Sequence, residues 1–200
     1  GHEYYDIQFL DNYFNCKNHV YTQLFNNLTK DLNIIIQKFS SQLPDEYVAV
    51  HYRDYIKKYD EQDCKNGTFV DHSPIDSFYN LISNLNSKYA NLPLIIFSNN
   101  NEIYKKFKNK FSEKIVLSLF LKNQSIIEQR NNLQNMMKSI IDFVFMMKSN
   151  LIIGSYGSSF SDEAIFLNKI VKLIPLSNSL RNKLIANNVL YHCLGFNFVK

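Results

Sequence analysis

The stretch "LIIGSYGSSFSDEA", residues 151–164, joins an apolar run to a glycine, a cluster of serines and two acidic residues. The run Leu151–Gly154 carries no polar side chain, which is typical of a strand buried on both faces. The serines that follow it are typical of a tight turn leading into a helix. The stretch therefore predicts a strand, a turn and a helix, with hydroxyl groups gathered at the carboxyl end of a buried strand.

Four further runs have the same continuous apolar character, and helical patterns lie between them. Ser73 and Pro74 predict a helix start, with the serine as N-cap and the proline at the first helical position. Residues 133–147 carry apolar side chains at spacings of three and four. This alternation predicts an α/β fold, a Rossmann-like parallel sheet with helices on both faces. The other predicted strands are "EYVAVHY" (46–52), "LPLIIFS" (92–98), "KIVLSLF" (114–120) and "KIVKLIP" (169–175).

Composition favours one compact domain. The chain has 200 residues, of which 46% are hydrophobic, and only five glycines and four prolines, so flexible linkers are not expected. We expect a single nucleotide-binding type of domain over residues 1–200, with residues 1–45 as a helical lead-in packed on it. No apolar run reaches the roughly 18 residues of a membrane span, so we expect a soluble domain. The sequence leaves open whether its compartment is the cytoplasm or the lumen of the secretory pathway.

Several classes of function are disfavoured. A net charge of +4 without a stretch of dense basic and aromatic residues argues against nucleic acid as a partner. Three distant cysteines form no C-x-x-C pair, which argues against zinc and thioredoxin chemistry. Neither G-x-G-x-x-G nor G-x-x-x-x-G-K occurs, which argues against dinucleotide oxidoreductases and P-loop enzymes.

Open parallel sheets bind ligands at the carboxyl ends of their strands, and the first predicted strand ends in His51 and Arg53. An arginine at this position can hold a phosphate or carboxylate through two parallel hydrogen bonds. The alternative is an ion pair between Arg53 and Asp54 that closes the edge of the sheet. His51 is as compatible with a structural role as with a ligand contact.

Two further strand ends carry polar residues. Ser98, Asn99 and Asn100 follow the second strand, where short polar side chains commonly cap the next helix. In the opening stretch, the free amides of residues 159–161 and the positive end of the helix dipole would form a seat for an anion. An ordinary serine-capped helix is the alternative. We expect the acidic residues 162 and 163 to face away from such an anion.

These residues resemble the fucosyltransferases that use GDP-fucose, most closely the α-1,2 branch. That branch carries H-x-R-R-G-D-Y after a strand, where this chain has "VAVHYRDYI", residues 48–56. It carries an F-S-D-D-like turn, where this chain has "IIFSNNNEIYKKF", residues 95–107. Its S-S-F-S-W-W-G-A block is matched by "SSFSDEA", residues 158–164. Order and spacing agree over residues 7–175, and the nodulation and protein O-fucosyltransferases share a similar pattern.

The resemblance implies the donor-binding half of a GT-B-type glycosyltransferase. Such an enzyme binds GDP-fucose without a metal or other cofactor and transfers fucose, with inversion, to a hydroxyl of a glycan or glycoprotein acceptor. Carried over by position, Arg53 would be the catalytic residue that holds the diphosphate and steadies the leaving GDP. The implied donor-binding residues are His51, Arg53, Asn99, Ser158, Ser159 and Phe160.

The chain departs from the family pattern in four ways. The loop between Arg53 and Asp54 is two residues shorter, and Asn99 and Asn100 replace two acidic residues. Asp162 and Glu163 replace a tryptophan pair, and we expect the acceptor half to be absent or truncated. These departures keep open an alternative, a catalytically inactive nucleotide-sugar-binding or scaffold module of the same fold. A third possibility is an unrelated α/β domain whose serine turn is only a helix cap.

Overall fold

The computed structural model describes residues 15–17, 19–20, 23, 27–54, 69–117, 133–168, 170–186 and 196–197. The chain divides into two compact units, residues 1–43 and 44–200. The first contains helix α2, Lys30–Ser40, whose N-cap Thr29 accepts a hydrogen bond from the amide of Leu32. That residues 1–45 pack on the larger unit stays a prediction.

The larger unit is built on a parallel sheet, which has six strands among the described residues. The strand order is β3-β2-β1-β4-β5-β6, and every neighbouring pair is parallel. This confirms the predicted Rossmann-like α/β fold. The two-residue strand β6 was not predicted, and residues 118–120 of the third predicted run lie outside the described residues. The strands are β1 Val48–Tyr52, β2 Leu94–Ser98, β3 Val116–Leu117, β4 Leu151–Gly154, β5 Lys172–Leu173 and β6 Phe196–Asn197.

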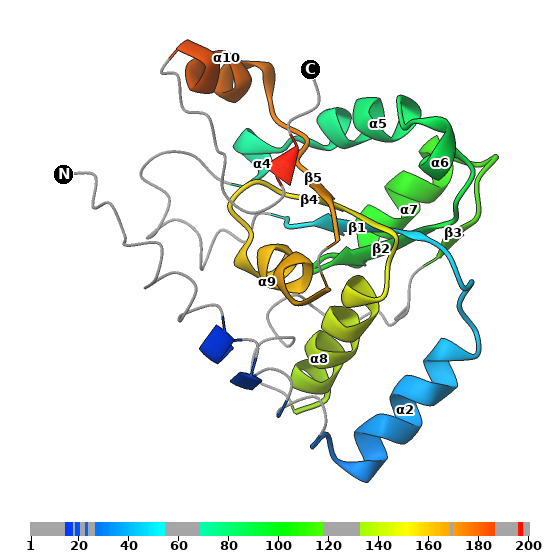
Figure 1. Cartoon of the computed structure of the whole chain (residues 1–200). Helices are drawn as coiled ribbons and strands as arrows, with labels where there is room; N and C mark the ends of the chain where they lie inside the picture. The colour runs from blue at the N-terminus through cyan, green and yellow to red at the C-terminus, as the bar shows by residue number, and fades with distance from the viewer. Residues whose placement is uncertain are drawn as a thin grey trace. The chain divides into compact units, whose positions relative to one another are not determined.

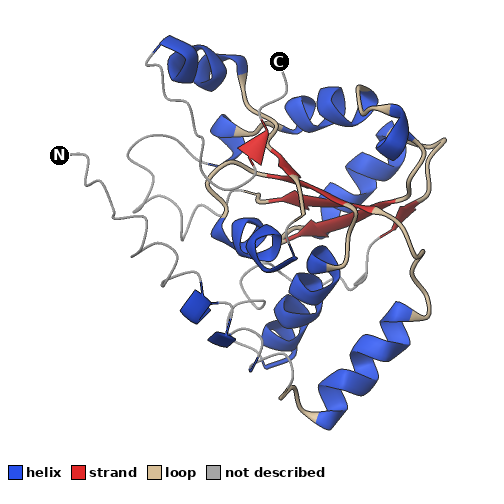
Figure 2. Ribbon diagram, in the orientation of Figure 1, coloured by secondary structure: helices blue, strands red, loops and turns tan. Residues whose placement is uncertain are grey.

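Helices lie on both faces of this sheet, as predicted. In Figures 1 and 2, α5 and α7 lie on one side of the strands, and α8 and α9 lie on the other. Polar ends of strands therefore emerge between two helical layers. The helices of this unit are α4 Phe69–His72, α5 Ile75–Ser83, α6 Ser87–Ala90, α7 Asn101–Lys110, α8 Leu133–Met147, α9 Ser159–Asn168 and α10 Asn178–Ala186.

The alternation of side chains along β1 separates two apolar layers. Val48, Val50 and Tyr52 belong to one core cluster with Phe78 of α5 and Phe107 of α7. Because successive residues of a strand point to opposite faces, His51 points toward the α8 and α9 layer. Its ring centroid lies 5.5 Å from that of Phe160 in α9.

The start of α5 differs from the prediction. Pro74 occupies the N-cap position, without a side-chain cap hydrogen bond, and the helix begins at Ile75. The Ser73 hydroxyl instead accepts a hydrogen bond of 2.9 Å from the amide of Tyr156, in the loop after β4. Ser73 is fully buried, and a buried hydroxyl forms whichever hydrogen bond the tertiary structure offers. The Ser73 hydroxyl therefore links the segment before α5 to the loop after β4, and it does not cap its own helix.

The order in which the strands are added to the sheet changes side at β1. Strands β2 and β3 lie on one side of β1, and strands β4, β5 and β6 lie on the other. At such a switch point the connections leave in opposite directions, and the crevice between them is the usual ligand site of doubly wound sheets. The carboxyl ends of β1 and β4 thus mark the place where a functional site is expected.

Candidate anion-binding site at the end of β1 and β4

The ends of β1 and β4 are joined directly. The amide of Ser155 donates to the carbonyl of His51 at 3.1 Å. The amide of Arg53 donates to the Ser155 hydroxyl at 3.0 Å. The first and third polar groups predicted from the sequence therefore lie at one place, and the arginine and the serine turn are neighbours.

The turn after β4 connects this strand to α9. Gly157 has φ of 68°, a left-handed conformation that costs glycine little and other residues more. The Ser158 amide donates to the Ser155 carbonyl at 3.3 Å, and the Asp162 amide donates to the Ser158 carbonyl at 3.1 Å. Helix α9 begins at Ser159, so its first amides precede the regular helical pattern and carry the positive end of the dipole. These amides are the ones from which the sequence predicts an anion seat, and the binding of an anion there stays a prediction.

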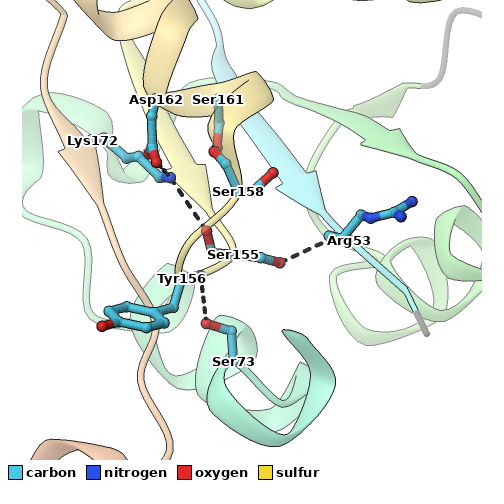
Figure 3. Close-up of polar contacts among 8 residues, drawn as sticks. All are labelled: Arg53, Ser73, Ser155, Tyr156, Ser158, Ser161, Asp162 and Lys172. Atoms are coloured by element: carbon cyan, nitrogen blue, oxygen red, sulfur yellow. Dashed lines mark hydrogen bonds and ion pairs between the residues drawn. The ribbon is translucent and has the colours of Figure 1, made fainter. Parts of the chain in front are cut away.

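The serine side chains of the turn differ in exposure. Ser158 is buried, whereas Ser159 is exposed. The Ser161 hydroxyl donates to the Ser158 carbonyl at 3.2 Å. Figure 3 shows the turn between Lys172 on one side and Arg53 on the other, with the Arg53 guanidinium extended away from Ser155. An anion held by both the guanidinium and the helix tip would have to lie between them.

Phe160 takes part in packing. Its ring lies 5.5 Å from that of His51 and 5.4 Å from that of Phe143, measured between centroids. The side chain thus joins α9 to β1 and α8. Any contribution of Phe160 to an anion seat would come from its backbone amide at the second position of α9.

His51 is held in an environment that disfavours its charged form. It is 7% exposed, and no described residue gives its Nδ1 a hydrogen-bond partner. Burial, followed by the positive charges of Lys172, Arg53 and Lys138, lowers the pKa of His51 to about 3. The imidazole is therefore neutral near pH 7.

This neutral histidine predicts a specific dependence of stability on pH. An unfolded histidine titrates near 6.5, so below that pH the unfolded state takes up a proton that the folded state does not. Stability therefore falls as the pH drops through 6.5, and His51 alone should remove about 2 kcal/mol of unfolding free energy between pH 7 and pH 5. Urea unfolding at both pH values measures this. A His51→Leu variant should lose that part of the decrease, and an equal decrease in both proteins would contradict the assignment.

The turn after β2 forms the cap expected from the sequence. The Asn100 carboxamide accepts a hydrogen bond from the Glu102 amide at 3.0 Å and caps α7. Asn99 connects the ends of β2 and β1, because its Oδ1 accepts from the Asp54 amide at 2.8 Å and its Nδ2 donates to the Asp54 carbonyl at 3.3 Å. Asn100 also donates to the Asp54 carboxylate at 2.5 Å. Asn99 therefore lies at the predicted edge and has a structural role there.

Lys172 of β5 is a residue that the sequence analysis missed. Its side chain is fully buried, and its ammonium donates to the Ser155 carbonyl at 3.2 Å and to the Asp162 carboxylate at 2.5 Å. Burial lowers the pKa of this ammonium, and Asp162 opposes that shift. The carboxylate of Asp162 thus faces the ammonium of Lys172 (Figure 3). The sequence signal was a lysine within an otherwise apolar strand.

Gly154 leaves the space that Lys172 and Ser161 occupy. A Cβ atom at Gly154 would lie 2.7 Å from Lys172 Cε and 2.8 Å from Ser161 Oγ. The lysine cannot move away without breaking its two hydrogen bonds. Gly154→Ala should therefore lower the free energy of unfolding by roughly 1–3 kcal/mol, as overpacking does. Urea unfolding measures it, with Ser159→Ala as an exposed control that should change little, and a loss equal to that of the control would contradict the prediction.

Among the described residues, no group of three or more histidine, cysteine, aspartate or glutamate side chains could hold a metal ion. Within the same residues, every helix is too short or too polar to cross a membrane.

The chain matches no protein-family model and no curated protein. It is similar to solved structures of three fucosyltransferases. The NodZ α-1,6-fucosyltransferase soaked with GDP-fucose has 13% identity and a TM-score of 0.48, over 75% of this chain and 47% of that one. The apo form of POFUT1 has 11% identity and a TM-score of 0.49, over 71% and 44%. A mutant of Arabidopsis thaliana FUT1 in complex with GDP has 12% identity and a TM-score of 0.47, over 73% and 33%.

The chain thus spans less than half the length of each of these structures. With identities and TM-scores this low, the assignment of the fold rests on the strand order and pairing of this chain itself. The resemblance to the α-1,2 branch stays a prediction from the sequence.

Proposed function

We propose that the larger unit binds a nucleoside diphosphate sugar, GDP-fucose, and serves as the donor-binding half of a GT-B-type fucosyltransferase. The observation that carries the proposal is the pair of hydrogen bonds that joins Arg53 and His51 to Ser155 at the switch point of the sheet. These bonds hold the backbone of Arg53 next to the loop that leads into α9. In the proposal, the Arg53 guanidinium and the amides at the tip of α9 are the donors that two linked phosphoryl groups need. The choice of guanosine and fucose rests on the motif resemblance.

In this proposal the reaction is an in-line displacement at the anomeric carbon of the sugar. The bond from that carbon to the diphosphate oxygen breaks while the bond to the acceptor hydroxyl oxygen forms, and the acceptor proton leaves to a base. Arg53 and the first amides of α9 would stabilise the negative charge that grows on the departing GDP. The proposed step uses no metal ion. The proposed acceptor is a hydroxyl group of a glycan or glycoprotein.

A catalytically inactive nucleotide-sugar-binding module is the second candidate, and one observation favours it. The Asn99 carboxamide forms hydrogen bonds with both backbone groups of Asp54, and Asn100 caps α7. These residues replace the acidic pair of the family pattern, so they serve the fold at a position where a donor contact is implied. Glycosyl transfer with a panel of acceptors separates the two candidates.

Isothermal calorimetry with GDP, GDP-fucose and UDP-sugars tests the shared part of both proposals. We expect GDP and GDP-fucose to bind with similar affinity and UDP-sugars to bind more weakly. Absence of GDP binding by the whole chain would instead support the reading of the serine turn as an ordinary helix cap.

A further inference from the structure

We propose that the fully buried Lys172 and the partly exposed Asp162 form a positioning pair that sets the direction of the α9 tip. The inference rests on the proposed function, since it assigns these residues a task at the same site. Lys172 comes from β5 and Asp162 from the first turn of α9. Lys172 lies outside the motifs through which the chain resembles a known family, and Asp162 stands where the pattern of that family has a tryptophan.

The contacts of Lys172 define what the pair can do. Its ammonium donates to Ser155, the first residue after β4, and to Asp162, in the first turn of α9. One cation therefore joins the beginning of the loop, residues 155–158, to the helix that the loop leads into. A rotation of the α9 tip about the loop would break one of these two hydrogen bonds.

Direct ligand binding by Lys172 is excluded by its surroundings. Its side chain has no exposed surface, and the Asp162 carboxylate compensates its charge. The pair has no net charge, so it does not attract an anion bound at the tip of α9. Its effect on a ligand has to act through the position of the loop and of the amides of residues 159–161.

Stability alone does not account for an ion pair whose lysine is fully buried. Desolvation of both ions offsets much of their attraction, and well-packed apolar residues of similar size are often as stable. An apolar replacement of both residues should therefore keep the fold. It should also remove the directional hydrogen bonds that orient the loop, which gives a way to separate positioning from stability.

The test compares the wild-type chain with a Lys172→Met/Asp162→Ala double variant. We expect the double variant to melt close to the wild type, to bind GDP at least ten-fold more weakly, and to exchange the backbone amides of residues 155–162 at least ten-fold faster. A matched control is Lys138→Met/Asp142→Leu, which removes an ion pair of 2.8 Å on α8. That control should keep both the GDP affinity and the amide exchange of the loop.

Wild-type GDP affinity and wild-type loop exchange in the folded double variant would overturn the inference. If the double variant does not fold, Lys172→Met alone replaces it, because Asp162 is 32% exposed and can be solvated without its partner. If the wild-type chain binds no GDP, the proposed function fails on its own. The amide exchange then decides the inference, since exchange unchanged from the wild type refutes loop positioning and faster exchange supports it.

Discussion

An Arg53→Ala variant is expected to bind GDP about 30- to 1000-fold more weakly than the wild type while keeping its melting temperature. Hydrogen bonds to a charged group contribute on the order of 1.5–3 kcal/mol, so the loss of a two-pronged contact should cost about 2–4 kcal/mol. The fold should persist because the contact that Arg53 makes with the serine loop uses its backbone amide, which alanine retains. Calorimetry and thermal unfolding measure the two quantities.

The control for this variant is Lys110→Ala. Lys110 also carries a positive charge, but it lies in the last turn of α7, and a helix that follows a parallel strand runs back toward the amino ends of the strands. Its removal should leave GDP affinity unchanged. If Arg53→Ala binds GDP as the wild type does and melts at a lower temperature, Arg53 is a structural residue of the sheet edge.

Replacement of Asp162 is expected to destabilise the protein much more than replacement of its partner Lys172. Asp162→Ala leaves a fully buried ammonium without its carboxylate, which should cost about 3–5 kcal/mol. Lys172→Met leaves a carboxylate that reaches water, which should cost about 1–2 kcal/mol. Urea unfolding at pH 7 measures both variants.

The pH dependence of the Asp162→Ala variant adds a second check. Burial lowers the pKa of Lys172, and the Asp162 carboxylate opposes this shift. The Asp162→Ala variant lacks that opposing carboxylate. The folded variant then holds fewer protons than its unfolded state, so its stability should rise with pH. Glu102→Ala, which breaks an exposed pair with Lys105, should change little. Equal losses in Asp162→Ala and Lys172→Met would contradict the asymmetry.

The strands could be predicted because burial on both faces requires an unbroken apolar run, and β1, β2 and β4 each have one. The meeting of Arg53 with the serine turn could also be predicted, because parallel strands bring their carboxyl ends to one edge. Asn100 followed from local chemistry, since a cap depends only on its own helix. The strands and the cap are thus encoded within a few neighbouring residues, and the meeting of the strand ends follows from the parallel arrangement of the strands.

Other features depend on contacts between distant segments. Lys172 and Asp162 are ten residues apart, and only the packing of α9 against β4 and β5 pairs them. Ser73 has the local sequence pattern of an N-cap, but its hydroxyl accepts a hydrogen bond from the Tyr156 amide, eighty-three residues away. A strand of two residues such as β6 has no periodicity to detect. No pattern in one segment contains this information.

The junction between α4 and α5 has a consequence for how the chain could be divided. Its residues bind loops from the other half of the sheet: Ser73 holds Tyr156, the His72 carbonyl accepts from the Ser177 amide, and the Ser77 hydroxyl donates to the Leu176 carbonyl. A fragment ending after β3 would expose these groups, and a fragment beginning before β4 would lose their partners. We therefore expect the two halves of the sheet to fold as one cooperative body, and pieces cut between them to regain structure only when recombined.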